Sequence, residues 1–457
     1  MSYSDAITQL NALAPELYAQ PGAPRRKFTL DEIRLLCAAL GNPQHRYPSV
    51  LIAGTNGKGS TAATLASIAR SSGIRVGLYT SPHLDRVNER IRIGHPDLDS
   101  IREIPDADFA RHYFLVHDAA QALVLAGKLS TLPSYFELMT AVAFSFFAES
   151  AIELAVLEVG MGGRLDATNI VEPLVSIITD ISLDHQEWLG ETIAAIAREK
   201  AGILRPNGVM VTLPQHPEAN QALGEVATAL AARGVNAAEY MPARNTPDHG
   251  SYPLEVLRET INICSPLEGA HQRRNIALAI AAAVELREEH GLPITAVAIA
   301  HGIRSTHWPG RMEHFQLAQW PEVILDVAHN PAGAWALRSA FNALNSEPQN
   351  SPRKNVLVFG CLRDKPAAEL AQILFPLFDS IVLTPVPSPR TTDMATLCTA
   401  ASQTGAAFSV ATGTQHALEI ARDQAGIHGR IILSGSVYLV GEARHRILEA
   451  RERGQRS

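Results

Sequence analysis

The sequence predicts an α/β protein: a mostly parallel sheet of P-loop type flanked by helices, followed by a smaller α/β domain. Three observations support this fold class. Short apolar runs of strand length alternate with longer segments of helical periodicity, as in parallel sheets connected by helices. A glycine-rich turn joins one such run to a helix at residues 51–61. The chain has 457 residues, which is more than one hydrophobic core usually supports.

The N-terminal elements follow from capping and periodicity. Residues 29–32 match a capping box, Thr29 to Glu32, which predicts a helix through Leu40 that ends at Gly41. Apolar runs predict buried strands at 49–53, 74–79, 153–159, 174–179 and 209–213. Helical periodicity predicts helices at 62–70, 108–125 and 136–150.

The second half of the chain begins with a less regular stretch, residues 214–270, where we expect a helix and a small antiparallel insert. An alanine-rich helix is predicted at about 272–290. A second alternating series then predicts strands at 323–327, 355–359, 380–383 and 430–433, and helices at 334–344 and 437–450. Proline and glycine interrupt the pattern near 304–310, so we predict two domains, residues 1–305 and 306–457.

The most informative segment is the glycine-rich turn Gly54–Ser60. Glycines let backbone N–H groups approach phosphate oxygens, a helix N-terminus adds positive potential, and Lys58 adds a point charge. The turn departs from the usual P-loop pattern, because Ile52 replaces a glycine and Gly59 replaces Ser or Thr. A tight turn with a solvated lysine is the alternative. The flanking strand and helix favour a nucleotide site.

Polar residues gather at the ends of neighbouring predicted strands, where ligands bind in open parallel sheets. Glu158 closes an aliphatic strand, as an acid that holds Mg²⁺ near phosphates does, and the alternative is a solvated glutamate. Ser81 is equally typical of a structural Ser-Pro turn. His185 is as consistent with a substrate contact as with a metal ligand, because Mg²⁺ prefers oxygen ligands.

Lys200 lies on the same face of a predicted helix as Ile193, Ile196 and Ala197. A lysine in an apolar stripe must extend its ammonium group to water, find an anion or lose its charge. Burial would lower the pKa of Lys200 and free the amine to form a carbamate with CO₂. Extension of the side chain to water at the helix end stays open as the alternative.

Composition excludes several classes of protein. Hydrophobic residues make up 46% and charged residues 19%, as in ordinary globular proteins. The formal net charge of −7 lacks the basic bias of a nucleic-acid-binding protein, and no apolar run is long enough to span a bilayer. The four cysteines have no paired spacing, and the segment Met1–Asp5 lacks the features of a signal peptide. We expect a cytoplasmic protein without nucleic-acid or membrane partners.

Eight motifs occur in order along residues 30–445: Gly54–Ser60, Tyr79–His83, Asn88–Ile91, Glu158–Asn169, Leu183–His185, Arg198–Ile203, Trp308–Glu313 and Asp326–Pro331. Together they resemble the folylpolyglutamate synthase/dihydrofolate synthase family of the Mur ligase superfamily. The resemblance implies an N-terminal ATP-binding domain of the Mur-ligase central type and a C-terminal, Rossmann-like glutamate-ligase domain. It also accounts for Gly59 in the phosphate loop.

The resemblance implies ATP-dependent amide formation. A carboxylate of dihydropteroate or a reduced folate would take the γ-phosphoryl group of ATP, and the amine of L-glutamate would displace phosphate from the acyl phosphate. A carboxylate is a poor electrophile, so phosphorylation supplies the leaving group. Catalysis would then be mainly positioning and neutralisation of charge. We expect a monomer with these small-molecule substrates and Mg²⁺.

Matching positions imply the roles of individual residues. The expected Mg²⁺ ligands are Ser81, Glu158 and His185, and the expected catalytic residues are Lys58, His185 and Lys200, the last carbamylated. The expected ATP contacts are Gly57, Lys58, Gly59, Ser60, Asn275, Arg311 and Asp326. The expected pterin contacts are Ser134, Tyr135, Phe136, Glu137, Leu165, Asp166 and Ala167. His329 and Ser436 are expected near the incoming glutamate.

The sequence departs from the family near its N-terminus. Bifunctional members often carry an Asp-Leu-Gly-Leu-type stretch that helps to bind dihydropteroate, whereas this chain has Ala19–Phe28 there. Gly163–Asn169 resembles the bifunctional version, so we expect both activities, with polyglutamylation alone as the alternative. The basic cluster Arg25–Lys27 is either a contact for glutamyl carboxylates or a solvated loop.

Two rival functions stay open. A peptidoglycan Mur ligase shares the phosphate loop and a segment like Asp326–Pro331, but Gly163–Asn169 and the absence of an extra nucleotide-sugar domain disfavour it. A protein of another class would hydrolyse ATP as a binding or switch protein, without ligation. Release of ADP that glutamate and a folate leave unchanged would favour that rival.

Overall fold

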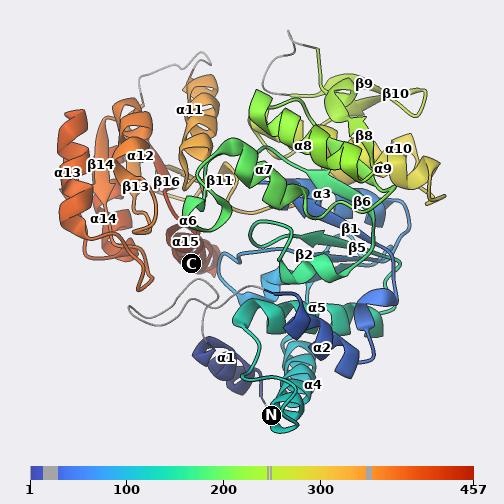
Figure 1. Cartoon of the computed structure of the whole chain (residues 1–457). Coiled ribbons are helices and arrows are strands. Elements are labelled where there is room, and N and C mark those ends of the chain that lie inside the picture. Colours follow the sequence, from blue (N-terminus) through green and yellow to red (C-terminus); the bar gives the residue numbers. More distant parts are fainter. Residues whose placement is uncertain (1, 14–28, 244–245, 247–249, 346–352, 457) are drawn as a thin grey trace.

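The structure is a computed structural model of the chain, and it describes residues 2–13, 29–243, 246, 250–345 and 353–456. Two sheets organise the molecule into an N-terminal half, up to residue 304, and a C-terminal half, from residue 310 (Figure 1). The N-terminal segment Ala19–Phe28, including Arg25–Lys27, lies outside the described residues, so the expectations for it stay untested.

The sheet of the N-terminal half has eight strands, and antiparallel pairing is confined to β2–β3 and β3–β4 at one edge. The other neighbours are parallel. In spatial order the strands are β4 (Arg102–Glu103), β3 (Ile91–Gly94), β2 (Val76–Tyr79), β5 (Leu154–Glu158), β1 (Ser49–Ala53), β6 (Pro173–Ile178), β7 (Val209–Thr212) and β8 (Arg233–Asn236).

Helices cover both faces of this sheet. Side chains of the central strands point alternately to the two faces, and each face packs with its helices in a separate apolar cluster. Val50 and Ile52 of β1 pack in the cluster that includes α3 (Lys58–Ser71), α9 (Ala270–Glu288) and α10 (Ala296–Arg304). Leu51 and Ala53 pack in the other cluster. Its helices are α1 (Tyr3–Ala12), α2 (Asp31–Ala39), α4 (Asp106–Leu125), α5 (Tyr135–Glu149), α7 (Ile193–Ala201) and α8 (Pro217–Ala229).

The C-terminal half contains a six-stranded sheet that is parallel except for its first pair, β11–β12. Its strands in spatial order are β11 (Glu313–Phe315), β12 (Glu322–Leu325), β16 (Arg430–Ser434), β13 (Asn355–Phe359), β14 (Ser380–Leu383) and β15 (Phe408–Val410). One face packs on α11 (Pro331–Asn345), α12 (Ala367–Leu374) and α13 (Met394–Thr404). The other packs on α14 (Thr414–Ala425) and α15 (Val437–Arg456).

The structure confirms the predicted fold class, with a helix and a hairpin in the irregular stretch: α8, then β9 (Tyr252–Val256) and β10 (Glu259–Ile263). The predicted capping box is wrong. Helix α2 begins at Asp31, and the N-cap position is Leu30, which has a turn-like backbone and no side-chain cap. The hydroxyl of Thr29 instead accepts a hydrogen bond from the Asp31 N–H over 3.4 Å.

The predicted boundary near residue 305 falls between α10 and β11, and the division into two domains stays a prediction. Within the described residues, the helices include none with the length and apolar character that crossing a bilayer would need. The segments that follow β1, β5, β6, β7 and β12 line a cavity between the two halves, and that cavity is the candidate site.

Candidate active site

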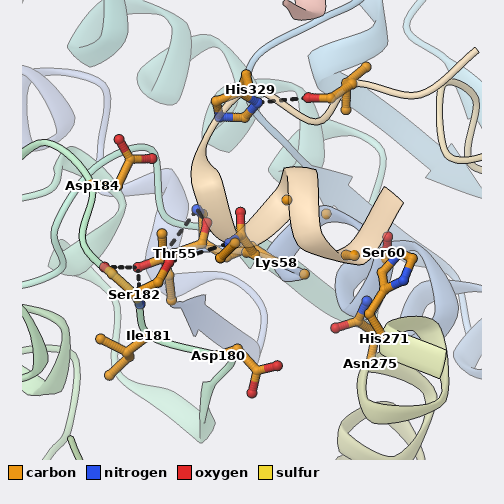
Figure 2. A pocket seen from close by; sticks show the side chains of 18 of the residues that line it. Thr55, Lys58, Ser60, Asp180, Ile181, Ser182, Asp184, His271, Asn275 and His329 are labelled. Atoms are coloured by element: carbon orange, nitrogen blue, oxygen red, sulfur yellow. Dashed lines mark hydrogen bonds between the residues drawn. The ribbon is translucent and has the colours of Figure 1, made fainter. Parts of the chain in front are cut away.

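A cavity of about 550 Å³ lies between the two halves of the molecule. Figure 2 shows Lys58 near its centre, Asp184 to one side and Asn275 to the other, with His329 of the C-terminal half above. The cavity brings together twelve residues that the sequence predicted for the site: Gly57, Lys58, Gly59, Ser60, Ser81, Glu158, His185, Lys200, Asn275, Arg311, Asp326 and His329.

Two positions of the phosphate loop, Gly54 and Gly57, require glycine because neighbouring side chains lie too close to leave room for a Cβ atom. A Cβ atom on Gly54 would lie 1.8 Å from the hydroxyl of Thr179, and one on Gly57 would lie 2.1 Å from the side-chain oxygen of Asn275. Gly57 also has a φ of 87°, which favours glycine, and it precedes the first turn of α3. The N-terminus of α3 therefore borders the cavity, as in a phosphate-binding loop.

The indole of Trp308 occupies the place where a side chain at position 59 would be. A Cβ atom on Gly59 would lie 2.8 Å from the indole ring. The guanidinium of Arg92 lies over the indole ring of Trp308, 4.9 Å from the ring centroid. The departure of Gly59 from the usual P-loop pattern thus has a local steric reason.

Two lysines converge on one backbone carbonyl. The Nζ atoms of Lys58 and Lys200 donate to the oxygen of Gly54 over 3.0 and 2.8 Å. Lys200 is only 4% exposed, so its side chain does not extend to water. Burial, and then the nearby Lys58, lower the pKa of Lys200 to about 7. Near neutral pH this amine is therefore partly uncharged, which is the state that reacts with CO₂.

Glu158 ends β5 inside the cavity and is 5% exposed, so the solvated alternative is wrong. Its Oε2 accepts a hydrogen bond from the backbone N–H of Ser81 over 3.1 Å. Burial raises the pKa of this carboxyl, while the charges of Lys58 and Arg311 oppose the rise. A buried carboxylate facing cations and the phosphate loop is suited to a bridging metal ion.

Two of the three residues predicted to bind Mg²⁺, Ser81 and Glu158, fit that ion in their chemistry, because it prefers oxygen ligands. Their oxygen atoms and the ring nitrogens of His185 border the same cavity as the phosphate loop. Among the described residues no group of three His, Cys, Asp or Glu side chains could enclose a metal. Such an open arrangement suits Mg²⁺, which is usually bound by one or two carboxylates together with waters and substrate phosphates.

His185 is followed by the short helix α6 (Gln186–Leu189) and has a φ of 49°. Burial lowers its pKa to about 4, so the imidazole is neutral at neutral pH. The His329 imidazole is also neutral, because burial lowers its pKa to about 4. Its Nδ1 lies 2.8 Å from the carbonyl oxygen of Val327 (Figure 2), so Nδ1–H donates there and Nε2 is left as an acceptor.

A polar network that the sequence did not predict joins the halves across the cavity. Lys365 forms a 2.8 Å ion pair with Asp184, 181 residues away. Burial alone would raise the pKa of Asp184, but the charge and the hydrogen bond of Lys365 lower it well below its usual value. Asn330 donates to Asp184 over 3.1 Å and to Asn56 of the phosphate loop over 3.0 Å. No local pattern indicates partners so far apart in sequence.

The C-terminal half also contributes Arg311 and Asp326. Asp326 is buried and Arg311 is half-buried, and the backbone N–H groups of Met312 and Ala328 donate to Asp326 over 3.1 and 2.9 Å. Burial raises the pKa of Asp326 and lowers that of Arg311, while each charge partly compensates the other. The pair places one anion and one cation opposite the phosphate loop.

A second cavity of about 240 Å³ adjoins the first. Its walls include Phe136 and Arg90 of the N-terminal half and Tyr438 and Ser436 of the C-terminal half. The two cavities share residues at their junction, namely Ser81, Pro82, Gly160, Met161, His185, His329 and Val437. A group bound in one cavity can therefore reach a group bound in the other beside these side chains.

Six of the predicted pterin contacts lie outside the lining of both cavities: Ser134, Tyr135, Glu137, Leu165, Asp166 and Ala167. Ser134 and Glu137 cap the N-terminus of α5. The carboxylate of Asp166 accepts the N–H of Met161, a residue of the junction, over 3.0 Å. Arg90 stacks on the ring of Tyr135 with 5.3 Å to its centroid. Asp166 and Tyr135 thus contact two residues that line the second cavity, Met161 and Arg90.

Comparisons with known proteins agree with the two halves of the chain. The Mur ligase middle domain family matches residues 113–283, and the Mur ligase glutamate ligase domain family matches residues 310–437. Folylpolyglutamate synthase of Lacticaseibacillus casei is 35% identical over 398 residues, which cover 85% of this chain and 87% of that protein.

Two further proteins extend the similarity. Dihydrofolate synthase/folylpolyglutamate synthase of Bacillus subtilis is 32% identical, over 92% of this chain and 94% of that protein. The structure of Mycobacterium tuberculosis folylpolyglutamate synthase complexed with ADP superposes with a TM-score of 0.83 and 33% sequence identity, covering 97% of this chain and 98% of that one. The similarity thus extends over both halves of the chain.

Proposed function

The chain belongs to the folylpolyglutamate synthase/dihydrofolate synthase family, and we propose that it is an ATP-dependent ligase that joins L-glutamate to a pterin or folate carboxylate. The observation that carries this proposal is the junction of the two cavities. One cavity has a phosphate loop and the other has an aromatic and cationic wall, so a nucleotide and an anionic aromatic substrate would meet at His185 and His329.

The reaction has two steps. An oxygen of the substrate carboxylate attacks the γ-phosphorus of ATP, and ADP leaves. The amine of glutamate then attacks the acyl carbon of this mixed anhydride, and the carbon–oxygen bond breaks to release phosphate. The cavity walls hold the reacting groups in position and exclude water, so that the anhydride meets the amine before it hydrolyses.

The phosphate loop would hold ATP through the N–H groups of Gly57–Ser60 and the ammonium group of Lys58. Mg²⁺, held by Ser81, Glu158 and His185, would neutralise phosphate charge. Asn275, Arg311 and Asp326 would complete the nucleotide contacts. His329, whose Nε2 is an acceptor, and Ser436 lie in the second cavity, where the glutamate amine would arrive.

Lys200 would act as a carbamate. Its partly neutral amine adds to CO₂ and loses a proton, which converts a buried cation into a carboxylate-like anion. Such an anion, next to Lys58 and the phosphate loop, would bind metal or orient Lys58. The 2.8 Å contact to the Gly54 carbonyl places the Nζ atom within the loop that would surround the phosphates.

We further propose that the enzyme is bifunctional. The Bacillus subtilis relative is named for both dihydrofolate synthase and folylpolyglutamate synthase, and Gly163–Asn169 resembles the bifunctional version. Asp166 within that segment supports Met161 at the cavity junction. The expected monomeric state stays a prediction.

A product assay tests the function directly. Purified protein is supplied with ATP, Mg²⁺ and L-glutamate, and with either dihydropteroate or tetrahydrofolate. We expect dihydrofolate from the first and a diglutamate from the second, each with one ADP. Product from tetrahydrofolate alone would leave only polyglutamylation. ADP release without any amide product would favour the switch protein, and ligation of a nucleotide-linked muramoyl substrate would favour a peptidoglycan ligase.

A further inference from the structure

The loop that carries Ser81 leads from β2 to the 3-10 helix Val87–Arg90. It is stabilised by hydrogen bonds to one carboxylate, that of Glu89. The two oxygens of Glu89 accept the backbone N–H groups of Leu84, Asp85 and Arg86 over 2.8, 2.9 and 2.9 Å. Hydrogen bonds from three consecutive N–H groups to one side chain make the segment a compact unit. A displacement of one end of the loop therefore also moves the other end.

The tip of this loop, Leu84, packs against the C-terminal half. The side chain of Leu84 packs against the apolar cluster of α14 and α15, and its methyl groups lie 3.3 and 3.4 Å from where a Cβ atom on Gly310 would be. A Cβ atom on Gly441 would lie only 1.9 Å from the Leu84 carbonyl oxygen. Helix α15 can therefore approach the loop backbone only because residue 441 is glycine.

Three residues on one side of α15 face the cavity junction and this loop. Val437, Gly441 and His445 are spaced four residues apart and so lie on one side of the helix. Val437 borders both cavities beside Ser81, Gly441 meets Leu84, and Nδ1 of His445 lies 3.0 Å from the carboxylate of Asp85. The same helix thus faces the cavity junction and the loop tip.

At its other end the loop reaches the site, where the Ser81 N–H donates to Glu158 over 3.1 Å. We propose that Gly441 and Leu84 are positioning residues: the seating of the Ser81 loop on α15 places Ser81 against Glu158, so this part of the site is complete only when the two halves are docked. The inference rests on the proposed function, because it assigns these residues to the positioning of groups in that reaction.

The test is Gly441→Ala, whose methyl group cannot coexist with the Leu84 carbonyl in its present place. We expect backbone hydrogen exchange of residues 81–90 to become at least tenfold faster while exchange of the β1 and β5 core is unchanged. Since a misplacement of about 1 Å costs on the order of a hundredfold in rate, kcat should fall by one to two orders of magnitude. Binding of an ATP analogue in EDTA should change less than twofold, because Gly57–Ser60 lie on another segment.

Gly224→Ala is the matched control. Gly224 is also inside a helix, α8, but a Cβ atom there would have no heavy atom within 4 Å, so exchange and turnover should equal those of the wild type. Leu84→Ala is the second variant if Gly441→Ala does not fold, and it should free the loop without a clash. Loop exchange and kcat equal to wild type in the folded variant overturn the inference. A wild-type protein that makes no amide product overturns the proposed function instead.

Discussion

At the residue scale, the site depends on how burial changes the charge of Lys200. Two amines point at the Gly54 carbonyl, and two positive charges so close together repel each other. Burial and Lys58 therefore favour the neutral form of Lys200, with a pKa of about 7. Either deprotonation or conversion to a carbamate relieves the repulsion. The carbamate would also place an additional anion beside Lys58.

We expect the carbamate to be observable in solution. Protein equilibrated with ¹³C-bicarbonate should give one carbamate carbon signal in ¹³C NMR, and Lys200→Met should remove it. The signal should grow as the pH rises through about 7, because the neutral amine is the reactive form. A spectrum identical for the wild type and Lys200→Met over this pH range would rule out carbamylation of Lys200.

At the element scale, the central strands could be predicted because they are buried on both sides. β1 has five buried residues and was predicted with its observed bounds, and β5 and β7 differ from prediction only at their ends. β3, β4, β8, β11 and β15 were not predicted. They are short strands at or next to the sheet edges with partly exposed residues, so they lack a continuous apolar run.

The site could be predicted where one segment supplies the chemistry, and not where distant segments meet. The glycines and Lys58 follow from a local motif, and the apolar stripe of α7 indicated the burial of Lys200. The Lys365–Asp184 pair and the contact of Gly441 with Leu84 join segments from different halves. Their geometry depends on how the halves dock, which periodicity and spacing do not encode.

The edge pair β11–β12 gives a prediction about stability. His314 lies 3.3 Å from Glu268 and 2.9 Å from Glu322. Burial alone would lower the pKa of His314, but these carboxylates outweigh it and raise the pKa to about 9. Because this value exceeds the unfolded pKa of about 6.5, the stabilisation is complete below pH 6.5 and is lost as the pH rises to about 9.

His314→Gln should remove this pH dependence. At pH 6 we expect the free energy of unfolding of the wild type to exceed that of the variant by on the order of 1 kcal/mol, because solvent screens the partly exposed ion pairs. The difference should vanish near pH 9. Urea titrations at pH 6, 7.5 and 9 measure it. A difference that is constant with pH would mean that the His314 charge contributes nothing.

At the scale of the whole molecule, neither half contains a complete site. The phosphate loop, Glu158 and Lys200 come from the N-terminal half, whereas Arg311, Asp326 and His329 come from the C-terminal half. Contacts that join the halves around the cavities include Asp184–Lys365, Asn56–Asn330 and the packing of Leu84 against α15. Docking of the two halves is thus what brings a nucleotide and a carboxylate substrate together.

The central claim is that the substrate carboxylate becomes an acyl phosphate where the two cavities meet. It is tested most directly with dihydropteroate whose carboxylate carries ¹⁸O, turned over with unlabelled ATP and glutamate. Mass spectrometry of the released phosphate should show one ¹⁸O atom for each amide bond formed, with the other ¹⁸O retained in the amide. Unlabelled phosphate accompanying amide formation would contradict the account, because the carboxylate oxygen would never have bonded to phosphorus.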